Sequence, residues 1–340
     1  MFTKKMKESW IIGLQMSLCG LICFFISQDF HFNQGFWSVV TISAITRPSF
    51  SGTFVKAGLR LCGTLFGAGT GFLMAEWIGY SPFALFVAIF IFSTVTVYIS
   101  LQTKPYNYLS IVAGFSAVIV IEAFLLDNIR SIALYRTVEV CIGILVMSII
   151  SWIMAQFFSS QTNFFDKDIG KKIATVYRSI HFSKVDLVNA LIISLTISLT
   201  FLSWMIFRYP QGIWLTITLF VVMEDTVAET QTKSFARLSG QIFAAILGGM
   251  VAIFFPTNML IIGLVLVIGF FICGSVIGYE SRFTASGNHA GSALAIMLLA
   301  GLPDNSTEVV MNRFVNVVAG IIIAMVVSHF QISKSKATEL

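Results

Sequence analysis

A segment of 35 residues occurs twice in this chain and restricts the fold more than any other feature. Residues 37–71 and 214–248 each begin with Trp and an apolar run, pass through a polar loop and continue into Lys-x-x-x-Arg-x-x-Gly. Matched positions keep a separation of 177 residues without a gap, as in Trp37 and Trp214, Arg60 and Arg237, Gly63 and Gly240, and Gly71 and Gly248. A gap-free match over this length predicts an internal duplication.

Basic and small residues share one face of the helix predicted at the end of each copy. Their steps of three and four residues match the helical period. The two sets are Lys56, Arg60, Gly63, Gly67 and Gly71, and Lys233, Arg237, Gly240, Ala244 and Gly248. Small residues at this spacing let membrane helices approach closely. A charge at a bilayer centre costs at least about 2.5–3.5 kcal/mol, so the cations are expected near a membrane face or a wet cavity. Snorkelling to the cytoplasmic surface stays open as an alternative.

The composition identifies a polytopic membrane protein. Of the 340 residues, 57% are hydrophobic and only 11% are charged, whereas a soluble domain averages about 25% charged residues. The net charge of +5 then reflects loop cations that orient membrane helices, and no nucleic acid partner is expected. Residues 10–27 follow three lysines but are too long for a typical signal-peptide core and lack a small-residue cleavage site, so we expect a retained first helix.

Twelve apolar segments divide equally between the two halves. They cover residues 10–28, 36–47, 53–77, 82–102, 107–126 and 131–158, then 186–207, 212–223, 234–255, 258–278, 285–302 and 310–330. A full span needs about 20 residues, so segments 36–47 and 212–223 are expected to be short or broken helices, and whether they cross is left open. The predicted fold is an all-α integral membrane protein, in which a six-segment helical unit is duplicated as two parallel repeats related by a pseudo-twofold axis along the membrane normal.

The halves define the predicted domains. Residues 1–158 are expected to form membrane repeat 1, residues 159–185 a cytoplasmic linker or surface helix, and residues 186–340 membrane repeat 2. With a cytoplasmic N-terminus, 17 of the 21 Lys and Arg residues lie inside, and the exceptions are Arg130, Arg136, Arg208 and Arg313. This bias predicts a multi-pass protein with both termini in the cytoplasm.

Motifs for catalysis and for metal or cofactor binding are absent from the sequence. There is no Walker loop, HExxH, EF-hand loop or GxSxG, and the five cysteines include no CxxC pair. The histidines His31, His181, His289 and His329 are scattered. We therefore expect neither an enzyme nor a metal or cofactor site. His289, inside a predicted helix, is either a hydrogen-bonded packing residue or a proton carrier.

Two further repeated pairs are candidates for a transport pathway. Arg136 and Arg313 are 177 residues apart, and glycine follows each at +7. They are either interfacial anchors or an anion-attracting pair at the external mouth. Trp37 and Trp214 are either interfacial or packing residues, or they stack on an aromatic ligand.

Acidic residues break the repeat. Glu224-Asp225 stands where the first copy has Arg47-Pro48. The two loops therefore carry opposite charge and are expected to pair across the pseudo-twofold axis. The alternative is that Glu224 or Asp225 titrates during transport, as carboxylates in proton relays do.

Together these motifs resemble the fusaric acid resistance and aromatic acid exporter family. The shared pattern is Gly-x-Trp before an apolar run, then Lys-x-x-x-Arg-x-x-Gly-x-x-x-Gly, then a later Arg with Gly at +7. It occurs at Gly35, Trp37, Lys56, Arg60, Gly63, Gly67, Arg136 and Gly143, and again at Gly212, Trp214, Lys233, Arg237, Gly240, Ala244, Arg313 and Gly320. Plant aluminium-activated malate channels are similar at this level. The chain departs from larger relatives in lacking their large cytoplasmic domain between the halves.

The resemblance implies an efflux protein of the bacterial inner membrane for organic, in particular aromatic, carboxylate anions. Our leading hypothesis is a secondary transporter whose pathway runs between the two halves. In our hypothesis, four cations attract the carboxylate from the cytoplasm (Lys56, Arg60, Lys233, Arg237), two tryptophans contact its apolar part (Trp37, Trp214), and two arginines lie on the exit side (Arg136, Arg313). The candidates for proton coupling are Glu224, Asp225 and His289. A periplasmic adaptor (membrane fusion) protein, an outer-membrane channel and a second copy of the chain are the implied partners, beside membrane lipid. A passive anion channel and a non-transporting membrane assembly partner stay open as alternatives.

Overall fold

A computed structural model describes residues 4–30, 35–126, 129–157, 168–300 and 307–332 of the chain. Within these ranges every regular element is an α-helix, which confirms the all-α prediction. His31 and the first part of the predicted linker, 159–167, lie outside the described residues.

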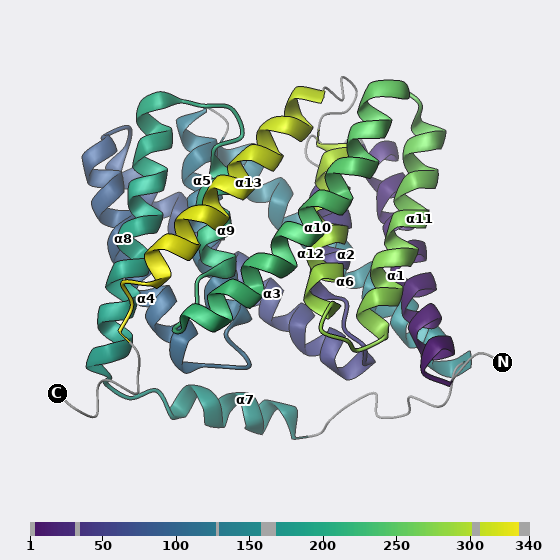
Figure 1. The fold of residues 1–340 in the computed structure, drawn as a ribbon, viewed down its shortest axis with the longest axis horizontal. Coiled ribbons are helices and arrows are strands. Elements are labelled where there is room, and N and C mark those ends of the chain that lie inside the picture. Colours follow the sequence, from purple (N-terminus) through teal and green to yellow (C-terminus); the bar gives the residue numbers. More distant parts are fainter. Residues whose placement is uncertain (1–3, 31–34, 127–128, 158–167, 301–306, 333–340) are drawn as a thin grey trace. The chain divides into compact units, whose positions relative to one another are not determined.

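The helices follow the predicted apolar segments closely (Figure 1). The first half contains α1 (Lys4–Asp29), α2 (Phe36–Ile45), α3 (Phe50–Ile78), α4 (Pro82–Gln102), α5 (Tyr108–Leu125) and α6 (Ile129–Phe157). After α7 (Ile169–Arg178), the second half contains α8 (Lys184–Phe207), α9 (Ile213–Val222), α10 (Val227–Phe254), α11 (Met259–Gly278), α12 (Thr284–Leu299) and α13 (Thr307–Ser328). The predicted surface helix in the linker corresponds to α7.

Nine of the described helices are long and apolar enough to cross a membrane, so the chain is a multi-pass membrane protein. The helices α2 and α9 have ten residues each, and at 1.5 Å per residue each reaches only ~15 Å, half of the ~30 Å hydrocarbon core. This confirms the prediction that segments 36–47 and 212–223 are short helices.

Short polar residues fix where several helices begin. Ser81 caps α4, where its Oγ accepts a hydrogen bond from the Ala84 N–H and Pro82 occupies the first turn.

The turns that follow α2 and α9 contain the same kind of hydrogen bond, from a backbone N–H to a threonine hydroxyl. The Thr53 hydroxyl accepts the Arg47 N–H at 3.1 Å, and the Thr230 hydroxyl accepts the Glu224 N–H at 3.0 Å. In each turn, the hydroxyl accepts a hydrogen bond from a backbone N–H that lies between the two helices.

The chain forms two compact units that interleave along the sequence. Unit 1 comprises residues 1–58, 135–166 and 236–314, and unit 2 comprises residues 59–134, 167–235 and 315–340. Each unit therefore takes helices from both halves of the chain. The long helices α3, α6, α10 and α13 each begin in one unit and end in the other.

Unit 1 is built on a ring of four helices. The helix α1 packs against α11 and α2, and α12 packs against the same two helices; Figure 1 shows α1 and α11 side by side. Small residues allow this contact, because a Cβ on Gly274 of α11 would lie 2.8 Å from the Gly13 Cα of α1. The Ser9 hydroxyl donates to the Ser275 carbonyl at 2.6 Å, which also ties α1 to α11.

Unit 2 contains a ring of the same kind. The helix α4 packs against α8 and α5, and α9 packs against the same two helices. The Phe220 ring of α9 occupies the space that a side chain at Gly114 of α5 would need. Glycine at position 114 therefore sets how closely α5 and α9 approach.

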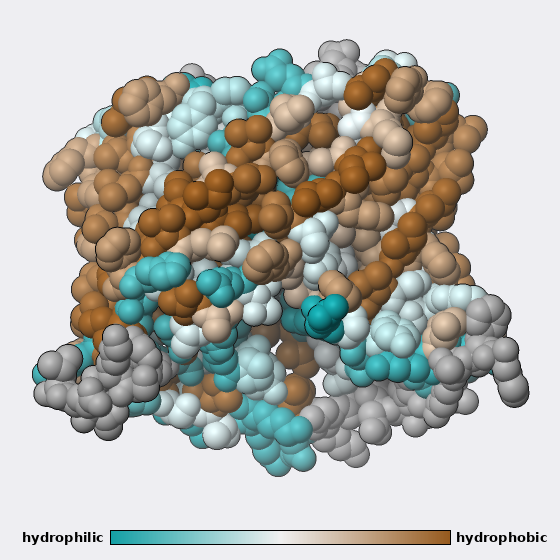
Figure 2. Space-filling view, in the orientation of Figure 1, coloured by the Kyte–Doolittle hydropathy of each residue, from teal (hydrophilic) through white to brown (hydrophobic). Residues whose placement is uncertain are grey.

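The exposed face of α11 carries a row of apolar side chains that suits contact with lipid. Leu260, Leu264, Ile268 and Ile272 follow one another at steps of four residues, and all are exposed. Figure 2 shows a continuous hydrophobic strip along this helix. An apolar stripe of this length would be unfavourable in water and is favourable against acyl chains.

The glycine stripes pack as their spacing predicts. In unit 2, a Cβ on Gly63 or Gly71 of α3 would lie 2.6 Å from a carbonyl oxygen of α5, and one on Gly67 would overlap the Ala113 backbone. In unit 1, a Cβ on Gly240 of α10 would lie 2.6 Å from the Ala290 nitrogen of α12. These positions accept only glycine at the observed helix separation.

Candidate functional site

The basic residues of the repeated stripe are buried within the helices. Lys56, Arg60 and Arg237 are each at most 9% exposed. Snorkelling to the surface would leave these side chains in water, so it does not describe them. Lys233 differs, because its side chain is 36% exposed.

Arg60 faces two aromatic residues in unit 2. Its guanidinium donates to the Tyr108 hydroxyl at 3.3 Å and lies 5.5 Å from the centre of the Phe115 ring. Both aromatics belong to α5, which reaches Arg60 because Gly63 lets α3 and α5 meet. The Arg60 Nε is buried and makes no hydrogen bond. An arginine has five N–H donors, so this one keeps donor capacity for an anionic partner.

Arg237 and Arg313 lie near each other in unit 1. Both guanidinium groups are buried, and their like charges are close enough to interact. Like charges in a low-dielectric setting repel strongly. An anion bound beside them would relieve this repulsion.

Trp37 and Arg136 come together in unit 1. The Arg136 Cζ lies 3.8 Å from the centre of the Trp37 ring, a cation–π contact. Gly143, two turns further along α6, makes this possible, because a Cβ there would lie 2.6 Å from the Ser38 carbonyl oxygen of α2. Both residues are buried, so their side chains contact other protein groups of unit 1.

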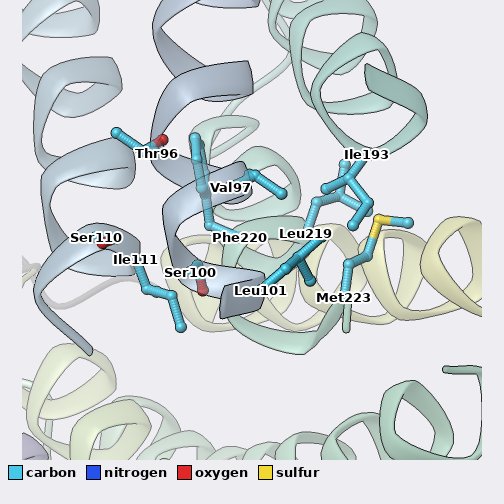
Figure 3. Close-up of a pocket in the computed structure, with 10 residues that line it drawn as sticks. All are labelled: Thr96, Val97, Ser100, Leu101, Ser110, Ile111, Ile193, Leu219, Phe220 and Met223. Carbon is cyan, nitrogen blue, oxygen red and sulfur yellow. The ribbon is translucent and has the colours of Figure 1, made fainter. Parts of the chain in front are cut away.

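Trp214 has a different partner in unit 2. Its Nε1–H donates to the Gln211 side-chain oxygen at 2.9 Å, and the residue is buried. A cavity elsewhere in unit 2, lined by residues of α4, α5, α8 and α9 and by Met223 (Figure 3), has a volume of about 10 Å³. That volume holds about one water molecule, so the cavity is too small for an aromatic acid.

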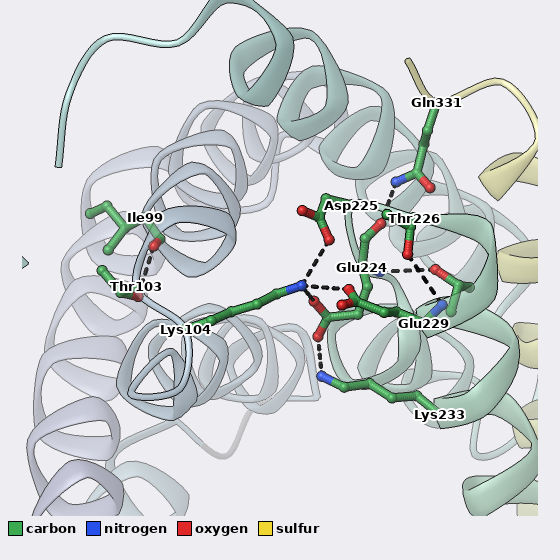
Figure 4. Close-up of polar contacts among 10 residues, drawn as sticks. Ile99, Thr103, Lys104, Glu224, Asp225, Thr226, Glu229, Lys233 and Gln331 are labelled. Carbon is green, nitrogen blue, oxygen red and sulfur yellow. Dashed lines mark hydrogen bonds and ion pairs between the residues drawn. The ribbon is translucent and has the colours of Figure 1, made fainter. Parts of the chain in front are cut away.

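Glu224 and Asp225 belong to an ion network in unit 2 (Figure 4). The Lys104 Nζ lies 2.8 Å from Glu224, 2.7 Å from Asp225 and 2.5 Å from Glu229, and Lys233 pairs with Glu224 as well. Burial alone would lower the pKa of Lys104, but hydrogen bonds to the three carboxylates raise the pKa above its ordinary value. The ammonium thus stays charged and occupies the centre of the acidic cluster.

Lys104 is the residue of this network that sequence reasoning missed. The positive-inside assignment placed it on the same side as Glu224 and Asp225, and this was the available signal. The carboxylates that could hold a cation have oxygens within 4.8 Å of one another, and the Lys104 ammonium contacts all three of them.

His289 is half-buried on α12 in unit 1. Its Cβ would lie 3.0 Å from a Cβ on Gly240, so it faces α10. The adjacent Asn288 anchors α12 to the end of α2, because its amide donates to the Ser43 carbonyl at 2.8 Å and the Thr46 carbonyl at 3.1 Å.

Glu139 on α6 is a second residue that sequence reasoning missed. It is 0% exposed and interacts electrostatically with Arg136, one turn earlier on the same helix. A carboxylate within an apolar span, three residues from a candidate arginine, was the signal available in the sequence.

Comparisons with known proteins give a family match. A family model described as fusaric acid resistance protein-like matches residues 21–150 and 193–327. A search of curated proteins and a search of solved structures each return no match.

Proposed function

The chain belongs to the fusaric acid resistance protein-like family, and from this premise we propose that it is a secondary transporter that exports organic, in particular aromatic, carboxylate anions across the bacterial inner membrane. Fusaric acid is itself an aromatic carboxylic acid. The observation that carries the proposal is Arg60, a buried cation with spare donors beside two aromatic rings.

The chemistry around Arg60 suits such a ligand. A guanidinium binds a carboxylate through two parallel hydrogen bonds, and the Tyr108 and Phe115 rings offer an apolar contact for an aromatic ring. Lys56, Lys233 and Arg237 are the other cations proposed to attract the anion. Trp37 and Trp214 are proposed to contact its apolar part, with Arg136 and Arg313 towards the exit.

The proposed architecture is a duplicated six-segment unit with both termini in the cytoplasm. The bounds of α2 and α9 differ by 177 residues at both ends, which supports the duplication. The rings α1–α2–α12–α11 and α8–α9–α5–α4 are formed by corresponding helices, which supports it independently. A periplasmic adaptor protein and an outer-membrane channel are the partners proposed for export across the envelope.

Charge reversal tests the cation assignment. In cells that express Arg60→Glu together with Arg237→Glu, we expect export of labelled p-hydroxybenzoate to be lost, because the carboxylate would meet repulsion in place of attraction. The matched control is Arg178→Glu on the exposed face of α7, which should export normally. Export at the wild-type rate by the double variant would contradict the assignment.

A milder variant at position 60 tests the same contact with less risk of misfolding. Arg60→Lys keeps the charge but loses the two-pronged carboxylate contact, and we expect the KM for the anion to rise by about tenfold. The thermal stability of each purified variant separates a binding defect from loss of the fold.

A further inference from the structure

Glu139 lies in an unusual environment for a carboxylate. It is fully buried in unit 1 near the start of the apolar span Tyr135–Phe157. It lies beside the backbone N–H of Trp37, at the beginning of α2, and interacts with the Arg136 charge. Neither of its carboxylate oxygens completes a hydrogen bond of standard geometry. A buried carboxylate without full hydrogen bonding is costly, so such residues in membrane helices are functional candidates.

Among the described residues of unit 1, Arg136 is the main charged group that interacts with Glu139. The helix α2 carries no titratable side chain. The helix α1 contributes the thiol Cys19, which contacts Met147 of α6, and the thiol Cys23, which interacts with Ser38 of α2. Thiols ordinarily titrate above neutral pH, so a charge change near Arg136 at lower pH would come from Glu139.

The other acidic candidates are held differently. Glu224 and Asp225 are bound by Lys104, and Glu224 also by Lys233. The position equivalent to Glu139 in the second copy is Asn316, whose amide donates to the Pro210 carbonyl at 3.0 Å. The second copy therefore has a neutral amide where the first has a carboxylate.

We propose that Glu139 is an internal counter-anion that competes with the transported carboxylate for Arg136, so that a proton binds to Glu139 whenever the anion binds to Arg136. The ionised Glu139 reduces the attraction of Arg136 for an external anion. Protonation removes the negative charge and leaves the guanidinium to the ligand. Reciprocal linkage then requires that the anion also favours proton binding. This inference rests on the proposed function, since it assigns anion binding to Arg136.

Anion binding to the purified full-length protein at several pH values tests the proposal, with benzoate as the probe. For the wild type, we expect the Kd for benzoate to fall as the pH falls. Glu139→Gln should bind benzoate about tenfold more tightly at neutral pH, because a repulsive charge is gone, and its Kd should no longer depend on pH. The matched control is Glu122→Gln, the same change in the apolar span of α5, which should behave as the wild type.

Calorimetry in two buffers of different ionisation enthalpy gives a second readout that needs no variant. Uptake of a proton by the wild type on benzoate binding is expected, and its absence would overturn the inference. A pH dependence that Glu139→Gln shares with the wild type would also overturn it. If the wild type binds no aromatic carboxylate at any pH, the proposed function fails, and the inference fails with it. Binding without linkage would contradict the inference alone.

Discussion

At the residue scale, Lys104 joins three carboxylates of unit 2. Its ammonium contacts two carboxylates on the turn between α9 and α10 and a third in the first turn of α10, and it thereby ties the end of α4 to the start of α10. Without this cation, three like charges would remain within 4.8 Å of one another. The network should therefore stabilise unit 2 more than an ordinary surface ion pair.

Lys104→Ala should lower the free energy of unfolding by about 1–3 kcal/mol, because hydrogen bonds to charged groups are lost and the carboxylates repel. Thermal unfolding of the purified protein in one detergent measures this. The control is Lys171→Ala, because the pair of Lys171 with Asp168 is exposed, with side chains 84% and 63% accessible. That control should not change the unfolding temperature, and equal effects of the two variants would contradict the assignment.

The pH dependence of the same network has a definite sign. The folded state raises the pKa of Lys104 above its ordinary value of 10.5. The stabilising contribution is then fully present below that ordinary value and is lost as the pH rises through the raised pKa. We expect the difference in unfolding temperature between the wild type and Lys104→Ala to stay constant from neutral to mildly alkaline pH. A difference that shrinks well below the ordinary lysine pKa would contradict this.

The individual partners of these residues could not be predicted from the sequence. Spacing placed Arg60 and Gly63 on one helical face, because the period of a helix is fixed. It could not indicate that Lys104, 120 residues away, reaches Glu224. Nor could it indicate that Glu139 lies beside Trp37, because both contacts depend on tertiary packing.

At the element scale, the sequence predicted the helices well because apolar length determines them. The main difference is α10, which begins at Val227, whereas the apolar segment begins at 234. Hydropathy omits the first two turns because they carry Glu229, Thr230 and Lys233. The glycine stripes could be predicted as close-packing faces, but their partners, α5 and α12, follow only from the structure.

Two glycines of α3 provide a direct comparison. Gly67→Ala should lower the free energy of unfolding by about 1–3 kcal/mol, because the methyl group overlaps the Ala113 backbone. Gly69→Ala has open space around the new Cβ and should be neutral or stabilising by up to about 1 kcal/mol through helix propensity. Thermal unfolding of the two purified variants measures the difference. Equal unfolding temperatures would show that α3 and α5 do not meet along this stripe.

At the scale of the whole molecule, the two compact units do not follow the two halves of the sequence. Unit 1 joins α1 and α2 to α11 and α12, and unit 2 joins α8 and α9 to α4 and α5. A repeated sequence pattern predicts that similar helices occur twice, but it does not reveal which half of the chain supplies each helix of a unit. Which helices join each unit depends on the packing of separate helices, and the periodicity along one helix carries no information about that packing.

The most direct test of the proposed export is uptake of labelled p-hydroxybenzoate into inside-out vesicles that contain the purified protein. A proton gradient is imposed in each direction in turn, and vesicles without protein serve as the control. We predict accumulation above the equilibrium level in one direction of the gradient, with loss of the accumulated label when the gradient is dissipated. Uptake that stops at equilibrium under every condition would contradict a coupled exporter and favour a passive channel. Uptake equal to that of protein-free vesicles would contradict transport of this anion.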